Sequence, residues 1–229
     1  DCDWSSDVCS SDLLAALETR LVLSHLACGN EVDAALNERQ RAAFAADAGK
    51  VAPGARLSLA NSGGIFLGAN FHFDLVRPGA AIMGLAPLVG RPNPMRTTVR
   101  LTAPIIQVRH VDSPGSVGYG ATHRIGAKAK IATVSVGYAD GYAFSLGNRG
   151  HAFLGSIRLP VVGRVSMDLI TLDATDVPDA LLRPGAEIEL IGPNLTPDDV
   201  ARSAGTIGYE VLTRLGARLH RRYLGGGAS

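Results

Sequence analysis

The pattern of hydrophobic and polar positions along the chain changes character near residue 95. Before that point, an apolar run over residues 20–27 predicts a buried strand, an alanine-rich run over 34–46 predicts a helix, and residues 56–60 predict a second short strand. A linker rich in proline and glycine follows at residues 87–94. Beyond it the helical patterns stop, and short β-branched runs predict strands over residues 98–102, 105–111, 130–136, 157–162, 169–172 and 187–191.

Capping signals place the expected helices more closely. Asp33 precedes the first helix and is its expected cap, and Thr196 followed by Pro197 predicts the start of a helix near the C-terminus. A short helix is expected over residues 209–215, and residues 13–18 resemble the end of another. The basic residues near the C-terminus are interpreted as a solvated strand end: Arg218, Arg221 and Arg222.

The first 13 residues do not match the rest of the chain. They contain two of the three cysteines, the only tryptophan and four aspartates, but no basic residue. We interpret residues 1–13 as an artefactual leader, a translated sequencing adaptor joined to a reading frame that begins partway through a gene. The alternative is a flexible native N-terminus.

Composition narrows the function classes. Apolar residues make up 46% of the 229 and charged residues 19%, which is typical of a soluble globular protein. No apolar run reaches the roughly 18 residues that a membrane helix needs, and the acidic start lacks a secretory pattern, so we expect a cytoplasmic protein that does not contact a membrane. Without the leader, 22 basic and 17 acidic residues leave a charge of +5, which suits small anions but does not indicate nucleic acid. Cys28 alone makes neither a disulfide framework nor a metal site.

Two tyrosines flanked by glycines provide the first candidate chemistry. Tyr119 lies in Val-Gly-Tyr-Gly, and Tyr138 lies in Val-Gly-Tyr-Ala-Asp-Gly-Tyr, 19 residues later. Glycine lets the backbone bend and approach a ligand closely. A phenol has an ordinary pKa of about 10, so it is a poor base unless its surroundings lower that value. The structural alternative is a turn at a strand end with a packed tyrosine.

Further motifs stand around these tyrosines. They are Asn61-Ser62, Arg77-Pro78-Gly79 and Gly163-Arg164-Val165-Ser166-Met167-Asp168, in addition to Gly118-Tyr119-Gly120. In order and spacing they resemble the alanine racemase family, enzymes that use pyridoxal phosphate (PLP), from about residue 14 to residue 224. The resemblance implies an α/β plus all-β fold: residues 14–97 would be the C-terminal part of a (β/α)8 TIM-type barrel, and residues 98–229 a β-rich C-terminal domain.

The resemblance implies a catalytic role for three residues. Tyr119 corresponds to one of the two acid/base groups on opposite faces of the substrate, and His25 to a histidine that hydrogen-bonds and tunes it. Arg77 corresponds to an arginine directed at the pyridine nitrogen of PLP, and its charge would leave that nitrogen unprotonated. Considered alone, His25 also fits a satisfied structural histidine, and Arg77 fits a surface salt bridge.

Binding roles follow from the same resemblance. A hydroxyl before two glycines makes Ser62 a plausible phosphate seat, although a plain loop is the alternative. The family assigns Ser62 to the PLP phosphate, with the backbone at Gly79 and Ala80 and the side chain of Tyr209. For the substrate, it implies that the amide of Met167 meets the carboxylate and that Tyr138 and Asp168 line the access to the site, whereas core packing is the alternative for Met167. In this family Tyr119, Tyr138 and Met167 act on the partner subunit's PLP, which implies a homodimer.

The lysine that carries PLP in this family is missing. Lys50, Lys128 and Lys130 are the only lysines, and none lies in the family's Lys-Ala-Asn-Ala-Tyr-Gly pattern. The substrate-binding arginine expected before His25 is also missing, and Gly29-Asn30-Glu31 replaces the usual Ala-Asp-Glu. We therefore interpret the sequence as the C-terminal fragment of an enzyme, inactive by itself.

The expected activity is the interconversion of L- and D-alanine, which supplies D-alanine for peptidoglycan. Three alternatives remain: a racemase for serine or a broader range of amino acids, a barrel protein that only binds PLP, and a β-rich interaction module without catalysis.

Overall fold

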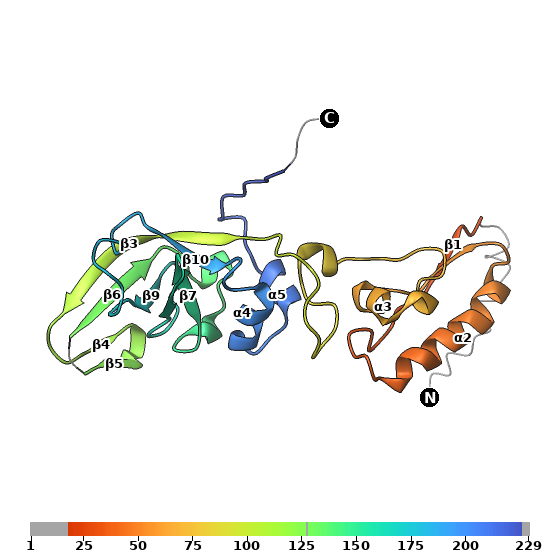
Figure 1. The fold of residues 1–229 in the computed structure, drawn as a ribbon, viewed down its shortest axis with the longest axis horizontal. Helices are drawn as coiled ribbons and strands as arrows, with labels where there is room; N and C mark the ends of the chain where they lie inside the picture. The colour runs from red at the N-terminus through yellow and green to blue at the C-terminus, as the bar shows by residue number, and fades with distance from the viewer. Residues whose placement is uncertain (1–17, 127, 226–229) are drawn as a thin grey trace. The chain divides into compact units, whose positions relative to one another are not determined.

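A computed structural model of the chain describes residues 18–126 and 128–225, which divide into two units between Met95 and Arg96 (Figure 1). The leader at residues 1–13 lies outside the described residues, as does most of the helix end expected at 13–18. Each unit has its own hydrophobic core.

The first unit begins with a short parallel strand pair. Strand β1 (Leu21–Leu23) pairs with β2 (Arg56–Ser58), and a third segment joins next to β2, where Arg77 N–H donates to the carbonyl of Ala60 at 2.9 Å. The buried strand expected over residues 20–27 is therefore shorter than predicted, and Leu23 is 57% exposed. The reason is that β1 has one paired neighbour among the described residues, whereas a strand buried on both faces needs its sheet complete.

Helix α2 (Ala35–Val51) connects these strands and extends five residues beyond the predicted end. The prediction that Asp33 caps it is wrong, because Ala34 occupies the cap position and no side chain accepts a hydrogen bond there. Phe44 of α2 packs edge-on against Phe73, with ring centroids 5.1 Å apart. The remaining elements of the unit are short: α3 (Ser62–Leu67) and the 3₁₀ helices η2 (Ala69–Phe71) and η3 (Ala81–Met83).

The second unit is a six-stranded antiparallel sheet with the order β8-β7-β10-β3-β6-β9. A bridge between Val161 and Leu172 joins its two ends, and Val162 N–H donates to the carbonyl of Thr171 at 2.9 Å, so the sheet closes on itself around the core. The strands are β3 (Leu101–Val111), β6 (Ala129–Val134), β7 (His151–Leu154), β8 (Ile157–Pro160), β9 (Ile170–Asp173) and β10 (Glu187–Ile191).

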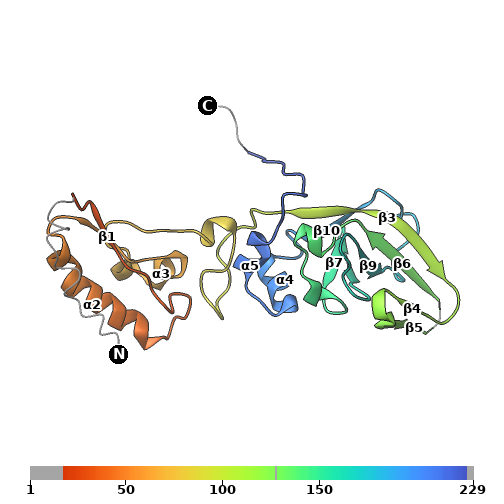
Figure 2. The same ribbon diagram turned by 180° about the vertical axis from the view of Figure 1, so that it is seen from behind.

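Several predicted strands of this unit are present, but two of the predicted strands are parts of one strand. The runs at 98–102 and 105–111 belong to the single strand β3, which continues through Pro104 with a register shift between Ile105 and Gln107. Strand β7 was not predicted, nor was the hairpin of β4 (Gly115–Val117) and β5 (His123–Ile125), because each is three or four residues long. The hairpin lies at the opposite end of the unit from the two C-terminal helices (Figure 2).

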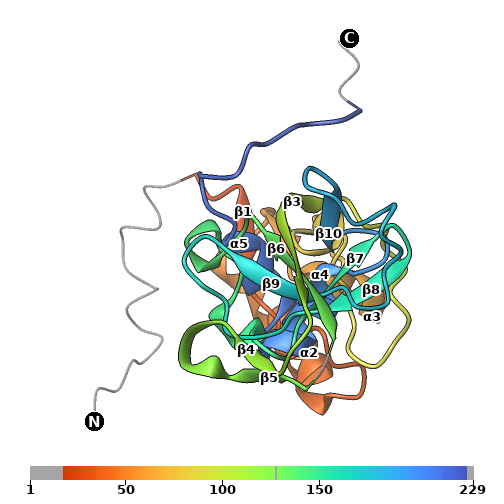
Figure 3. The same cartoon turned by 90° about the vertical axis from the view of Figure 1, so that its left-hand side faces the viewer.

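Those helices begin where the sequence predicted. Helix α4 (Pro197–Ala204) has a capping box in which Thr196 and Asp199 satisfy each other's backbone N–H, and α5 (Gly208–Thr213) follows it. No strand forms at Arg218, Arg221 or Arg222, contrary to the interpretation of these residues as a strand end. The chain instead leaves the unit as an extended segment, also seen in the perpendicular view (Figure 3).

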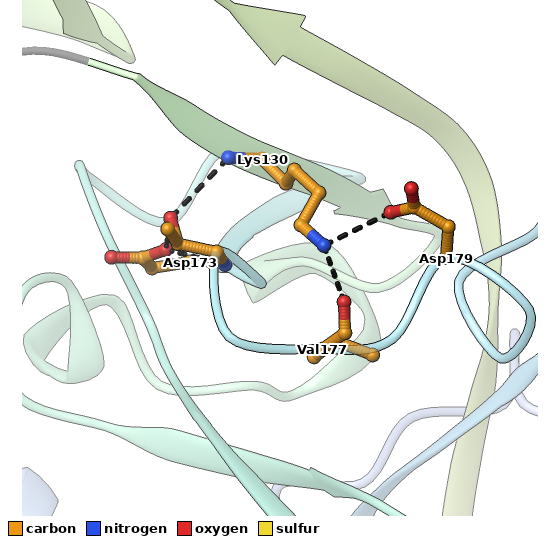
Figure 4. Close-up of polar contacts among 5 residues, drawn as sticks. Lys130, Asp173, Val177 and Asp179 are labelled. Carbon is orange, nitrogen blue, oxygen red and sulfur yellow. Dashed lines mark hydrogen bonds and ion pairs between the residues drawn. The ribbon is translucent and has the colours of Figure 1, made fainter.

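Lys130, at the start of strand β6, binds the loop that follows β9 (Figure 4). Its ammonium group donates to the carbonyl of Val177 and to Asp179 Oδ1, the latter at 3.0 Å. Its backbone N–H donates to Thr175 Oγ1 at 3.3 Å, and that hydroxyl binds Asp173 at 2.5 Å. Lys130 thus has a structural role in this unit. Among the helices that the structure describes, none is long and apolar enough to cross a membrane.

The two units should differ in solution behaviour. Because the first exposes Leu23, Ile82 and Met83 and leaves one edge of β1 unpaired among the described residues, the 229-residue chain should aggregate when purified. The segment 96–225, with its closed sheet, should remain monomeric and unfold cooperatively. Sedimentation and thermal melting of both would test this, and a soluble monomer of the whole chain with a sharp melt would contradict it.

Candidate functional site

In the first unit, the predicted site residues gather at the ends of the parallel strands. Arg77 donates from Nη1 to Ser58 Oγ at 2.5 Å and from Nη2 to the carbonyl of Ser24 at 2.6 Å. These contacts fix the guanidinium between β1 and β2. Arg77 is therefore not the surface salt bridge that was its alternative, since its described partners are neutral oxygens.

His25 lies at the end of β1 and contacts Asn61, with Nε2 3.1 Å from Nδ2 of the amide. Oδ1 of Asn61 accepts from Gly64 N–H at 2.9 Å, so Nδ2 is the donor toward the histidine. The imidazole then accepts at Nε2 and is neutral, with its proton on Nδ1. Asn61 belongs to the Asn61-Ser62 motif, and no local sequence pattern indicates its contact with His25.

The loop after His25 is held by α2 and by close backbone packing. Gln40 accepts from Ala27 N–H at 3.0 Å, and the buried Asn37 donates to the carbonyls of Cys28 and Glu31. A Cβ on Gly29 would lie 2.7 Å from Asn61 Oδ1. Glycine at position 29, where the family pattern has alanine, therefore leaves room for the amide that faces His25.

Ser62 and Gly79 meet in the first unit. The buried hydroxyl of Ser62 accepts from Gly79 N–H at 2.9 Å and from Ala81 N–H at 3.1 Å. Ala80 lies between these two donors. Both N–H groups are thus occupied by the Ser62 oxygen, and the hydroxyl keeps its own proton for donation.

In the second unit, Tyr119 begins the 3₁₀ helix η4 (Tyr119–Ala121). Its flanking residues Gly118 and Gly120 have φ of 75° and 71°, a left-handed conformation that favours glycine. Tyr119 is 74% exposed and lines an open cleft of about 460 Å³ with Gln107, Thr133 and Arg164 among its walls. It is therefore not the packed tyrosine of the structural alternative.

An unpredicted residue holds the Tyr119 turn in place. Asn148 accepts from Gly163 N–H at 2.7 Å and donates to Thr122 Oγ1 at 3.2 Å, which ties the end of η4 to the turn before Arg164. Asn148 has a positive φ of 56°. The Asn-Arg-Gly sequence signals a turn, but its partners are far away in the chain, so local patterns could not identify them.

Tyr138 and Met167 are joined by the register of β6 and β9. Val134 pairs with Ile170, and the two segments come together again four residues beyond this pair, at Tyr138 and Ser166. There Tyr138 N–H donates to the carbonyl of Ser166 and Ala139 N–H to that of Met167, both at 3.0 Å. A Cβ on Gly137 would lie 2.2 Å from the Met167 carbonyl oxygen, so only glycine fits.

Exposure separates the site residues from the structural ones. Met167 is 54% exposed, so the alternative of core packing is wrong, and Tyr138 is 42% exposed with its ring against Phe144. Tyr142, the third tyrosine of the motif, is buried, and that burial raises its pKa well above the ordinary value. It is therefore a core residue without acid/base function.

The remaining predicted residues also lie in the second unit. Tyr209 lies in the first turn of α5 and is half exposed, and partial burial followed by the charge of Asp198 raises the pKa of its phenol. Asp168 forms an ion pair with Arg218. Contacts between residues of different units, including the chain from Tyr119 through His25 to Arg77, stay predictions. Over residues 18–126 and 128–225, no three His, Cys, Asp or Glu side chains lie close enough to hold a metal.

Comparison with known proteins agrees with the predicted family over both units. The family model described as the C-terminal domain of alanine racemase matches residues 98–223, and the model of the N-terminal domain matches residues 3–87. The chain belongs to the alanine racemase family.

Individual alanine racemases resemble the chain along most of its length. That of Rhodospirillum rubrum is 57% identical over 212 residues, which cover 93% of this chain and 56% of the relative. That of Rhizobium meliloti is 47% identical over 223 residues, covering 93% and 59% respectively. The chain thus spans somewhat more than half the length of these curated relatives.

Two solved structures of the alanine racemase family have a similar fold. Alanine racemase from Bartonella henselae, solved with covalently bound pyridoxal phosphate, has a TM-score of 0.89 at 38% identity and covers 98% of this chain and 62% of its own. The enzyme from Streptomyces coelicolor A3(2) has a TM-score of 0.88 at 31% identity, with the same coverage.

Replacing Gly137 by alanine should separate the Tyr138 turn from the Met167 loop. The new Cβ would overlap the Met167 carbonyl, and overpacking of this kind costs about 1–3 kcal/mol of stability. Thermal unfolding should show a lower midpoint for Gly137→Ala. Gly126→Ala is the matched control, because a Cβ there meets nothing within 4 Å. Equal midpoints for the two variants would contradict the close approach.

Proposed function

We propose that this chain is part of an enzyme that interconverts L- and D-alanine and so supplies D-alanine for peptidoglycan. The observation that carries the proposal is the 57% identity to an alanine racemase across 93% of the chain. The site residues support it, because each family motif corresponds to an exposed or anchored group in the structure.

The proposed cofactor is PLP, which withdraws electrons from the α-carbon of a bound amino acid and so makes its proton removable. Ser62, with the backbone at Gly79 and Ala80, would hold the phosphate, since the hydrogen bonds from Gly79 and Ala81 hold this backbone against the Ser62 hydroxyl. Tyr209 would add a hydrogen bond from the second unit. Arg77 would donate to the pyridine nitrogen, and because a guanidinium does not lose its proton near neutral pH, it would keep that nitrogen unprotonated.

The proton transfer is assigned to Tyr119. Its exposed phenol would remove or return the α-proton on one face of the substrate, and a lysine outside this sequence would serve the other face. His25 would donate from Nδ1 to tune the phenol, while Asn61 keeps the ring oriented. The Met167 amide would bind the substrate carboxylate, and Tyr138 and Asp168 would line the access to the site.

We further propose that the enzyme is a homodimer in the cytoplasm. Tyr119, Tyr138 and Met167 all lie on the surface of the second unit and are at least 42% exposed. Side chains at that exposure are accessible to a second copy, whose PLP they would serve. The family resemblance supports this arrangement.

The first unit would be part of a TIM-type barrel. Its β1, β2 and the segment at Arg77 are consecutive parallel strands with site residues at one end, as in barrel enzymes. The relatives extend well beyond the matched region, and the lysine that carries PLP is absent from this sequence. The chain by itself should therefore not racemise alanine.

The sequence upstream in the parent gene provides the first test. Recovery of a Lys-Ala-Asn-Ala-Tyr-Gly motif in frame with Leu14 would support the enzyme. A genuine start codon directly before Leu14 would instead favour a non-catalytic PLP-binding or interaction protein.

In the full-length enzyme, Tyr119→Phe should slow racemisation by about 10²- to 10⁴-fold in both directions, because the phenol would remove the α-proton of one enantiomer and return it to form that enantiomer. The absorbance of bound PLP should persist, since Tyr119 is not a cofactor ligand in this proposal. Tyr223→Phe is the control, because Tyr223 is 87% exposed in the extended C-terminal segment. Loss of PLP absorbance in Tyr119→Phe would show that the tyrosine is structural.

A further inference from the structure

Three segments of the second unit converge on one arginine. Arg218 donates from Nη2 to Asp168 Oδ1 at 2.6 Å, and its Nε lies 3.3 Å from Asp140 Oδ1. Asp140 follows Tyr138 in the turn after β6, and Asp168 follows Met167 in the loop before β9. One guanidinium therefore bridges the two loops that carry the proposed substrate-binding residues.

The Asp140 end of this bridge is firmly built. The side chain of Asp140 is 11% exposed, and its second oxygen accepts from Gly137 N–H at 2.9 Å. The carbonyl of Asp140 accepts from Gly216 N–H at 3.0 Å, which brings the segment before Arg218 against the turn. The carboxylate of Asp140 therefore fixes the position from which Arg218 reaches Asp168.

The Asp168 end is the one next to the substrate position. Asp168 is half exposed and directly follows Met167, whose N–H has no hydrogen-bond partner within the described part of the chain. An unpaired carboxylate at this position would repel a second carboxylate approaching the same amide. Arg218 removes that repulsion, and both carboxylates together raise its own pKa.

We propose that Arg218 is a positioning residue for the substrate carboxylate: it neutralises Asp168 and holds the Met167 loop against the Tyr138 turn. The inference rests on the proposed racemase function. It predicts an effect on substrate binding rather than on proton transfer, because the described contacts of Arg218 are with Asp140 and Asp168 and not with Tyr119.

The test uses the full-length enzyme with Arg218→Gln. KM for L-alanine should rise about 5- to 20-fold while kcat changes less than 3-fold, and Arg218→Lys should recover part of the loss, because it restores the charge without the two-pronged geometry. Arg221→Gln is the matched control: Arg221 lies in the same segment but binds only the carbonyl of Leu215. A fall in kcat without a rise in KM, or equal effects of the two Gln variants, would overturn the proposal.

A double variant separates charge from packing. If Arg218 acts by neutralising Asp168, Asp168→Asn combined with Arg218→Gln should have a lower KM than Arg218→Gln alone. If the two effects on KM simply multiply, the charge-neutralising role is wrong.

Hydrogen exchange of the backbone in residues 166–169 gives a readout independent of activity. Exchange there should be faster in Arg218→Gln than in the wild-type enzyme, and unchanged in Arg221→Gln. If the wild-type enzyme does not racemise alanine, the proposed function fails, while this exchange measurement still decides whether Arg218 orders the loop. Unchanged exchange in Arg218→Gln would overturn the positioning role.

Discussion

The candidate site of the second unit depends on the contact between the Gly137 backbone and the Met167 carbonyl. The register of β6 against β9 sets this contact, because the pairing of Val134 with Ile170 continues, after a short interruption, into the meeting of the two loops. With no Cβ at position 137, the loops come close enough for two backbone hydrogen bonds. Tyr138 and Met167 are therefore placed by strand pairing, the most rigid element available, and not by their own side chains.

The same logic explains how far the sequence could predict the fold. The helix start at Thr196 and the strand at residues 187–191 were predicted because their signals are local: a capping hydroxyl followed by proline, and a short run of isoleucine and leucine. Strand β7 and the β4–β5 hairpin were missed because three or four residues carry too little pattern. The strand at residues 20–27 was predicted too long because a run of apolar residues reports how a strand would be buried in a complete sheet, whereas β1 has a single partner in the described chain.

The candidate site residues differ from the residues that support them in how far the sequence could predict them. Ser62, Arg77, Tyr119 and Met167 were predicted as site residues from motifs, because chemistry that touches a ligand demands particular residue types at particular places, and these roles stay predictions. Their supports were not found. Asn61 contacts His25 at a separation of 36 positions, Asn148 contacts Thr122 at 26, and Arg218 contacts Asp168 at 50. Local pattern carries no information about such contacts, so only the fold reveals them.

The arginines of the two units, Arg77 and Arg218, differ in the groups that they bind. In the first unit, Arg77 binds neutral oxygens of Ser58 and Ser24, so its charge remains available to a ligand. In the second unit, Arg218 is paired with two carboxylates, so its charge is used within the protein. Under the proposed function, a cation without a carboxylate partner would suit a site that holds an anionic cofactor, whereas a compensated one would suit a loop that presents a backbone amide to a carboxylate. The two arginines, similar as residues, are thus directed to opposite tasks by what surrounds them.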